Sequence, residues 1–149
     1  MSGYLLDVNV LIALTWPTHV HHRVARAWFE RAGQASWATC PITQLGFVRV
    51  SSNPAAIRDA VRPGEAVAML DRLTAMRGHQ FWADEVPVAL SGPFESLSLV
   101  GHRQVTDAYL VALARHHGGK LATLDRGVAD LLPDPGDREA CVELIPLQS

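Results

Sequence analysis

The chain has 149 residues, enough for one domain with a buried core and too few for two. Hydrophobic residues make up 48% and charged residues 19% of it, which excludes a disordered or fibrous chain. The net charge of −2 excludes a general nucleic-acid coat, which needs a basic surface, but not an enzyme that holds RNA at one place.

Targeting and redox signals are few. The uncharged run 8–20 is too short to span a membrane and is interrupted by Pro17, and no secretory leader is recognised. The two cysteines, Cys40 and Cys141, can form at most one disulfide, and their spacing resembles neither a metal knuckle nor a disulfide framework. We therefore expect a cytoplasmic protein without a membrane anchor.

The first half of the chain alternates short apolar runs with helical patterns. It predicts, in order, a strand 4–7, a helix 8–15, a helix 21–32 that Gly33 ends, a strand 36–40, a helix that begins at Pro41 and runs toward Asn53-Pro54, and a helix 63–77. The stripes expected to face the core are Val24, Ala27, Trp28 and Arg31 in helix 21–32, and Val67, Leu70 and Leu73 with Thr74 in helix 63–77.

The second half continues the alternation. It predicts a strand 80–83, a short helix or turn 93–99, a helix 107–117 that Gly118-Gly119 ends, a strand 120–124, a short helix 126–132 and a last strand 142–145. Strands that alternate with helices indicate an α/β fold with a mainly parallel sheet. In such sheets ligands bind outside the carboxyl ends of the strands.

Three aspartates stand where these apolar segments meet. Asp7 and Asp125 follow predicted strands, and Asp107 opens a helix. Each has a structural alternative, because Asp is a favoured N-cap. Asp107 fits that alternative least well: it shares a helix face with Leu110, and Thr106 could cap the helix instead.

Carboxylates that meet at one edge of a sheet repel one another and raise one another's pKa values, and a divalent cation relieves this repulsion. Mg²⁺ and Mn²⁺ prefer oxygen ligands, whereas zinc is disfavoured because no histidine or cysteine occurs at these junctions. Such an all-carboxylate site is suited to hydrolysis of phosphodiesters by metal-activated water.

Three segments, YLLDVNVLIAL, CPITQLGFVRV and VTDAYLVALARHHGGKLATLDRG, resemble the PIN domain in their order and separation, and among PIN domains the VapC-type toxins of bacterial toxin–antitoxin systems. The similarity covers residues 4–132. It implies a PIN-like three-layer α/β fold, a small mainly parallel sheet flanked by helices, with residues 1–149 as a single domain. It also implies an endoribonuclease that depends on Mg²⁺, for which Mn²⁺ can substitute.

The resemblance assigns roles to single residues. Asp7, Asp107 and Asp125 match metal-binding, catalytic aspartates of the family. Asn9 and Thr106 match polar positions that support the site.

One position departs from the family pattern. The family usually has a glutamate on the helix after the second strand, and the residue that aligns there is Gln44. Its carbonyl oxygen can orient a water or a ligand but brings no charge, so we expect Gln44 to act as a positioning residue of the catalytic set. Asp84 is a possible compensating acid, with a simple loop aspartate as the alternative.

Several other polar residues have two interpretations. Arg103 and Gln104 are candidate contacts to RNA phosphates, with a plain loop as the alternative. The run His19–His22 is expected to form a surface loop and not a metal site. His116 and His117 fall in the last turn of a helix, where partial positive charge is favourable. Most of the four tryptophans are expected in the core or a partner surface, and Trp16, beside Pro17, is expected to be exposed.

The resemblance further implies a homodimer, an RNA substrate that is transfer or ribosomal RNA, and a cognate VapB-type antitoxin. The antitoxin would lay a C-terminal segment over the groove and put a cation among the acids.

Two rival functions remain. One is a PIN-like module that binds RNA or a partner without cutting, with Gln44 as the lesion. The other is a phosphatase-like protein that uses Asp7 as nucleophile, against which Asn9 counts because such enzymes need Asp-x-Asp.

Overall fold

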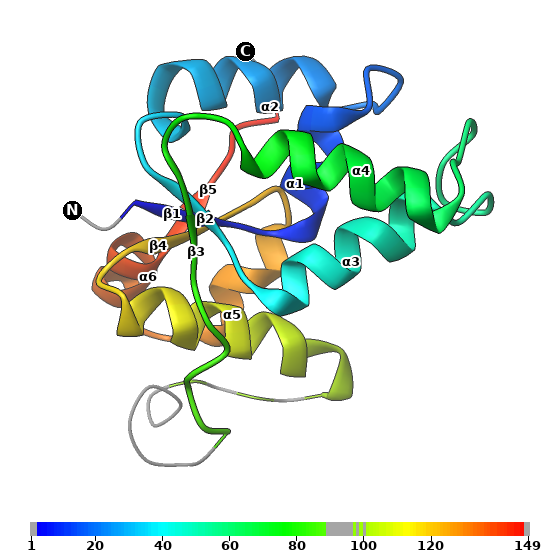
Figure 1. The fold of residues 1–149 in the computed structure, drawn as a ribbon. Coiled ribbons are helices and arrows are strands. Elements are labelled where there is room, and N and C mark those ends of the chain that lie inside the picture. Colours follow the sequence, from blue (N-terminus) through cyan, green and yellow to red (C-terminus); the bar gives the residue numbers. More distant parts are fainter. Residues whose placement is uncertain (1–2, 89–96, 98, 100, 148–149) are drawn as a thin grey trace.

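A computed structural model describes residues 3–88, 97, 99 and 101–147. The described residues form one parallel sheet (Figure 1). Its strands are β1 (Tyr4–Leu6), β2 (Trp37–Thr39), β3 (His79–Phe81), β4 (Lys120–Thr123) and β5 (Val142–Leu144), in the order β3-β2-β1-β4-β5. Since every pairing is parallel, all carboxyl ends lie at one edge, and β1 stands at the centre, between β2 and β4.

Helices cover both faces of this sheet. The helical elements are α1 (Val8–Thr15), α2 (His22–Trp28), η1 (Phe29–Gly33), α3 (Pro41–Ser51), α4 (Pro63–Thr74), η3 (His102–Gln104), α5 (Val105–His116), η4 (Arg126–Leu131) and α6 (Pro135–Cys141). Residues of α5 and η4 belong to the hydrophobic cluster on one face, and residues of α1, α2 and α3 to the cluster on the other. The helix α4 packs outside α3. The three-layer arrangement implied by the resemblance is therefore present.

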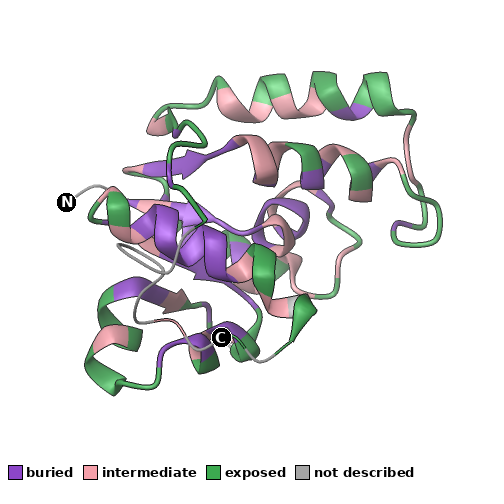
Figure 2. Ribbon diagram, turned by 90° about the horizontal axis from the view of Figure 1, so that it is seen from below, coloured by how far each residue is buried: buried purple, intermediate pink, exposed green. Residues whose placement is uncertain are grey.

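The strands at the centre of the sheet, β1, β2 and β4, are mostly apolar because both of their faces are buried, whereas the edge strand β3 is largely exposed. Leu5 and Leu121 belong to the cluster under α5, whereas their neighbours Leu6 and Ala122 belong to the opposite cluster. All four are fully buried. Figure 2 shows that buried residues concentrate in the strands and in the helix turns against them, while exposed residues occupy the outer turns.

The predicted helix 21–32 is divided in two. After α2 the chain widens into the π-helical turn η1, in which the Gln34 N–H donates to the Phe29 carbonyl oxygen at 2.8 Å. The buried side chains are Ala25, Trp28 and Phe29. Of the predicted stripe, Trp28 is buried and Val24 is partly buried, whereas Ala27 and Arg31 are exposed and were predicted wrongly. The two neighbouring aromatic rings both find partners: Trp28 packs edge-on against Tyr4, and Phe29 against Trp37.

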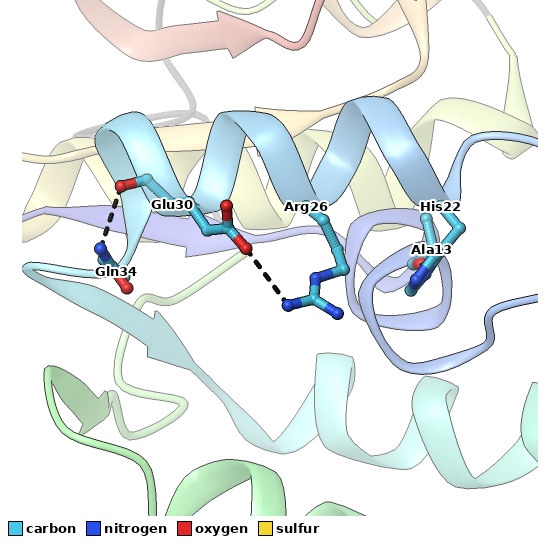
Figure 3. A network of polar contacts seen from close by, with 5 residues as sticks. All are labelled: Ala13, His22, Arg26, Glu30 and Gln34. Carbon is cyan, nitrogen blue, oxygen red and sulfur yellow. Dashed lines mark hydrogen bonds and ion pairs between the residues drawn. The ribbon is translucent and has the colours of Figure 1, made fainter.

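Polar contacts hold this helix along its outer side (Figure 3). Arg26 pairs with Glu30 one turn later at 3.2 Å, and the Gln34 side chain donates to the Glu30 carbonyl oxygen at 3.0 Å. At the other end His22 Nδ1 donates to the Ala13 carbonyl oxygen at 2.7 Å and joins α2 to α1. Because the Arg26–Glu30 pair is exposed, it stabilises the helix by only about 0.3–0.5 kcal/mol.

Other elements differ from the predictions at their ends. The helix α4 buries Ala66, with Leu70 and Leu73 partly buried, whereas Val67 is 52% exposed and does not belong to the buried stripe. The helix α5 begins at Val105, two residues early. The helix α6 was not predicted, although Asp134 caps it and Pro135 begins it. The predicted element 93–99 falls almost wholly outside the described residues.

The tryptophans belong to the core. Trp28, Trp37 and Trp82 are buried, and so is Trp16, whose Nε1 donates to Ser51 Oγ at 3.1 Å. The predicted exposure of Trp16 is therefore wrong, because the side chain finds both apolar cover and a partner for its N–H.

Both cysteines are buried and free. None of the helices in the described part of the chain is long and apolar enough to cross a membrane.

Candidate active site

A cavity of about 380 Å³ opens at the carboxyl edge of the sheet. The three predicted aspartates all line it, each from a different place in the chain: Asp7 from the β1–α1 junction, Asp107 from the first turn of α5, and Asp125 from the β4–η4 junction. The remaining lining residues are Val8, Asn9, Ile12, His19, Val50, Ala56 and Ile57. The parallel sheet and the N-terminus of α5 thus bring together side chains that are up to 118 residues apart in sequence.

Asp7 is held by two hydrogen bonds. It caps α1, since its Oδ1 accepts from the Val8 N–H at 2.8 Å, and its Oδ2 accepts from Thr123 Oγ1 at 2.7 Å. Burial raises the pKa of this carboxyl, the two hydrogen bonds oppose the rise, and the charge of Asp125 adds to it. Asp7 is only 7% exposed, so its orientation is fixed before any ligand binds.

Thr123 organises the site, although it was not among the residues predicted from the sequence. Its Oγ1 donates to Asp7 and accepts from the Asp125 N–H at 3.1 Å and from Asn9 Nδ2 at 3.4 Å, which uses the full capacity of a hydroxyl group. Asn9 Oδ1 in turn accepts from the Leu124 N–H at 3.2 Å. A threonine at the end of a buried strand, two residues before an aspartate, is the signal that could have identified it.

The capping alternative holds for two of the three aspartates. Asp125 is exposed and caps η4, with its Oδ1 accepting from the Gly127 N–H at 2.9 Å, and Asp7 caps α1. Capping does not exclude metal binding, because each carboxylate oxygen has a second lone pair.

Asp107 has no capping role. The N-cap of α5 is Gln104, and no described residue donates a hydrogen bond to the Asp107 carboxylate. Burial raises the pKa of Asp107 to about 6, and the charges of Asp7 and Asp125 contribute to the rise. A half-buried carboxylate without a donor and beside two further carboxylates is the group that a cation would stabilise most.

Thr106 does not cap α5 as expected, because the helix begins one residue before it. It is exposed and lines a different cavity, of about 340 Å³, together with Asp84 and Tyr109. Asp84 accepts a hydrogen bond from the Tyr109 hydroxyl and does not line the aspartate cavity. Its position agrees with the loop interpretation and not with a compensating acid.

Gln44 is also not among the residues that line the aspartate cavity. Its Nε2 donates to Thr39 Oγ1 at 3.0 Å, and Thr39 Oγ1 lies 2.7 Å from His79 Nε2. The bond to Thr39 uses one of the two N–H donors of the Gln44 amide. Gln104 Oε1 accepts from the Gly101 N–H at 3.3 Å, while the Arg103 side chain lies outside the described residues.

His19 lies in the loop between α1 and α2, as predicted, and it also lines the cavity, which was not predicted. Its Nδ1 accepts from the His21 N–H at 3.0 Å, so the neutral ring carries its proton on Nε2. Burial lowers the pKa of His19, and the nearby His21 and His22 lower it further. A neighbouring cavity of about 430 Å³ shares His19 with the first and extends to Arg58.

The cavity has the electrostatics of a cation site. Of its described lining residues three are aspartates and none is lysine or arginine. The donors are oxygen atoms on side chains held by the ends of a helix and two strands, which is the donor type that Mg²⁺ and Mn²⁺ bind. The residues present therefore fit a hard divalent cation.

Comparisons with known proteins identify the family of the chain. The family model described as PIN domain matches residues 4–131. The curated relative Ribonuclease VapC39 of Mycobacterium tuberculosis is 47% identical over 126 residues, which are 85% of this chain and 91% of the relative.

Two solved structures share the fold at low sequence identity. The structure of FitAB bound to an IR36 DNA fragment has a TM-score of 0.62 at 18% identity, covering 95% of this chain and 94% of that one. The structure of VapBC2 from Rickettsia felis bound to a DNA fragment from their promoter has a TM-score of 0.59 at 10% identity, covering 96% and 98%. With the family model and the curated relative, these comparisons show that the chain belongs to the PIN domain family.

Proposed function

We propose that this chain is an Mg²⁺-dependent endoribonuclease, the toxin of a VapBC-type pair. The observation that carries the proposal is the convergence of Asp7, Asp107 and Asp125 in one cavity whose described lining has no lysine or arginine. A curated relative at 47% identity is named a ribonuclease, which supports the same chemistry here.

The three aspartates are the proposed metal ligands. When bound, a divalent cation supplies positive charge at the phosphoryl group and lowers the pKa of water. The carboxylate of Asp7 has a fixed orientation in this site, because the Val8 N–H and the Thr123 hydroxyl each donate a hydrogen bond to one of its oxygens. Asp107, with a pKa of about 6, holds a proton below that pH and is ionised above it. Loading of the site is therefore expected to become easier as the pH rises through 6.

Polar residues on the walls of the cavity suggest how RNA is bound. The Nε2–H of His19 is a neutral donor on the wall and suits a phosphate oxygen or a base edge. The neighbouring cavity leads from His19 to Arg58, an exposed cation suited to the next phosphate. Arg103 and Gln104, just before α5, remain candidates for contacts to RNA phosphates.

Supporting roles go to Asn9 and Gln44. Asn9 links the two aspartate-bearing segments through Thr123 and Leu124. Gln44 is proposed only as a positioning residue, because its amide donates to Thr39 Oγ1 and it does not line the aspartate cavity. The rival in which Gln44 makes the protein a non-cutting binding module is decided by the cleavage test.

The proposed setting is a cytoplasmic homodimer silenced by a VapB-type antitoxin, with residues 1–149 as one PIN domain. A fold neighbour was solved as VapBC2, which supports a partner of that type. A cation of the antitoxin among the three carboxylates would satisfy the same charge that a metal satisfies. The substrate is proposed to be transfer or ribosomal RNA.

The test is cleavage of total cellular RNA by the purified, antitoxin-free chain, with Mg²⁺, with Mn²⁺ or with EDTA, followed by mapping of new 5′ ends. Discrete metal-dependent cuts should be made by the wild type and be absent with Asp7→Ala and Asp107→Asn. Asp71→Asn, at an exposed aspartate on α4, is the matched control and should cut normally. Metal-loaded protein that binds RNA without cutting it would favour the binding module. A trapped aspartyl-phosphate on Asp7 would favour the phosphatase.

A further inference from the structure

A second group of potential metal ligands lies at the opposite end of α5 from Asp107. Glu85 follows β3, and His116 and His117 end the helix. One nitrogen from each histidine and one carboxylate oxygen of Glu85 lie within 4.8 Å of one another. Both rings approach the same oxygen: His117 Nε2 lies 2.9 Å and His116 Nε2 3.5 Å from Glu85 Oε1.

Hydrogen bonding does not account for this cluster. His117 Nε2 is buried, and despite its 2.9 Å distance from Glu85 Oε1 it makes no hydrogen bond with any described residue. The distance between these two atoms would allow a hydrogen bond, but their relative orientation does not. A buried ring nitrogen that makes no hydrogen bond is costly to a fold, and a metal ion bound to that nitrogen would remove the cost.

We propose that Glu85, His116 and His117 form a binding site for a transition metal of the zinc class, separate from the aspartate site. Two imidazoles and one carboxylate are a ligand set that zinc accepts, with the fourth position left to water. Ligand atoms of a tetrahedral zinc site are about 3.4 Å apart, given bonds of about 2.1 Å. The observed separations of 2.9 and 3.5 Å are close to that value.

The surroundings hold these ligands in place. The Trp82 ring stacks on His117, with centroids 4.2 Å apart and planes 9° apart, and Trp82 itself is buried. The neighbour of Glu85 in sequence, Asp84, accepts a hydrogen bond from the Tyr109 hydroxyl of α5. The segment that carries Glu85 is thus attached to α5 at two points, so metal binding needs little rearrangement.

The two sites are distinguishable in space and in chemistry. Asp107 and His116 are nine residues apart on α5, which is about 14 Å along the helix axis. The aspartates offer only oxygen and suit Mg²⁺, whereas the imidazoles suit zinc, cobalt or nickel. Saturating Mg²⁺ should therefore leave the proposed zinc site free.

The test is calorimetric titration of the tag-free full chain, stripped with EDTA and dialysed into Mg²⁺, with ZnCl₂. One equivalent of Zn²⁺ should bind to the wild type, and Glu85→Gln and His116→Ala should each weaken binding about ten-fold or more, since loss of an outer partner alone typically costs 10–100-fold. A hundred-fold excess of Zn²⁺ over Kd should raise the melting midpoint of the wild type by about 5–10 °C. Co²⁺ should give the visible absorption of a tetrahedral site.

Glu85→Gln is the decisive variant because Glu85 is exposed and its replacement keeps the shape, whereas His117→Ala would also remove the stack on Trp82. Asp107→Asn and His21→Ala are the controls for the aspartate site and for the other histidine cluster, and both should bind Zn²⁺ as the wild type does. The proposal is overturned if Zn²⁺ does not bind, if Glu85→Gln and His116→Ala bind it normally, or if a control variant loses it.

Discussion

Replacement of Asp107 by asparagine should make the metal-free protein more stable at neutral pH while it abolishes cleavage. The side chain keeps its size, and the charge that burial, Asp7 and Asp125 disfavour is removed. The difference between the usual pKa of 3.8 and about 6 corresponds to about 3 kcal/mol in the absence of screening. Solvent around a half-buried group reduces this to about 1–2 kcal/mol.

The pH dependence follows from the direction of the shift. Because the pKa of Asp107 is raised in the folded state, folding of the wild type is most favourable while Asp107 is protonated. This contribution to the free energy of unfolding is lost as the pH rises from about 4 through about 6. The gain in Asp107→Asn should therefore be near zero at pH 4 and complete above pH 7. For a chain of 149 residues it corresponds to a midpoint about 3–6 °C higher.

The assay is thermal or urea unfolding of both proteins in EDTA between pH 4 and 8, repeated with Mg²⁺ or Mn²⁺. Metal should stabilise the wild type more than Asp107→Asn. The difference in melting midpoint between the two proteins should therefore shrink or change sign when metal is added. Asp71→Asn, an exposed aspartate on α4, controls for the general loss of one charge. If Asp107→Asn were less stable than the wild type at pH 7.5 in EDTA, Asp107 would have a stabilising partner and the account of the site would be wrong.

Three further predictions concern the surroundings of the aspartates. Thr123→Val should lower the free energy of unfolding by about 1–3 kcal/mol, because the Asp125 N–H and Asp7 Oδ2 each lose the hydrogen bond to Thr123 Oγ1. Urea unfolding measures this change, Thr123→Ser is the control that keeps the hydroxyl, and an unchanged free energy of unfolding in Thr123→Val would contradict the prediction. His19→Ala should raise KM for a cleaved RNA about ten-fold with a smaller change in kcat, and His19→Gln should restore part of it; an unchanged KM would remove His19 from the RNA path. Gln44→Ala should lower the single-turnover rate by less than about ten-fold, whereas complete inactivation without unfolding would place Gln44 among the reacting groups.

Local patterns account for most of the elements that the structure contains. The short apolar runs before Asp7 and Asp125 are strands because both faces of the sheet are covered, so a continuous hydrophobic run is what such a strand requires. Both aspartates then cap the next helical turn. A strand followed by a capping residue is local information, which is why these two positions at the edge of the sheet were predictable from the chain alone.

The buried faces of the outer helices were not predictable in the same way. Val67 and Ala66 are one residue apart, and only the packing of α4 on α3 decides that Ala66 is buried and Val67 is exposed. The same holds for Trp16, which adjoins a proline and yet reaches Ser51 across 35 residues of sequence. Which face of a helix is buried depends on the neighbouring element, and that is not written in the helix itself.

The sequence by itself determined the α/β alternation and the positions of Asp7 and Asp125 after strands, because both depend on local patterns. Only the tertiary structure decided that His19 lines the cavity, that Thr123 joins Asp7 to Asp125, and that Gln44 does not line it. Hydrogen bonds and cavity walls join residues far apart in the chain, so their existence depends on how helices and strands pack. Residue spacing in the sequence predicts contacts within one element or between adjacent elements, whereas this site is formed by residues from several strands and helices of the folded sheet.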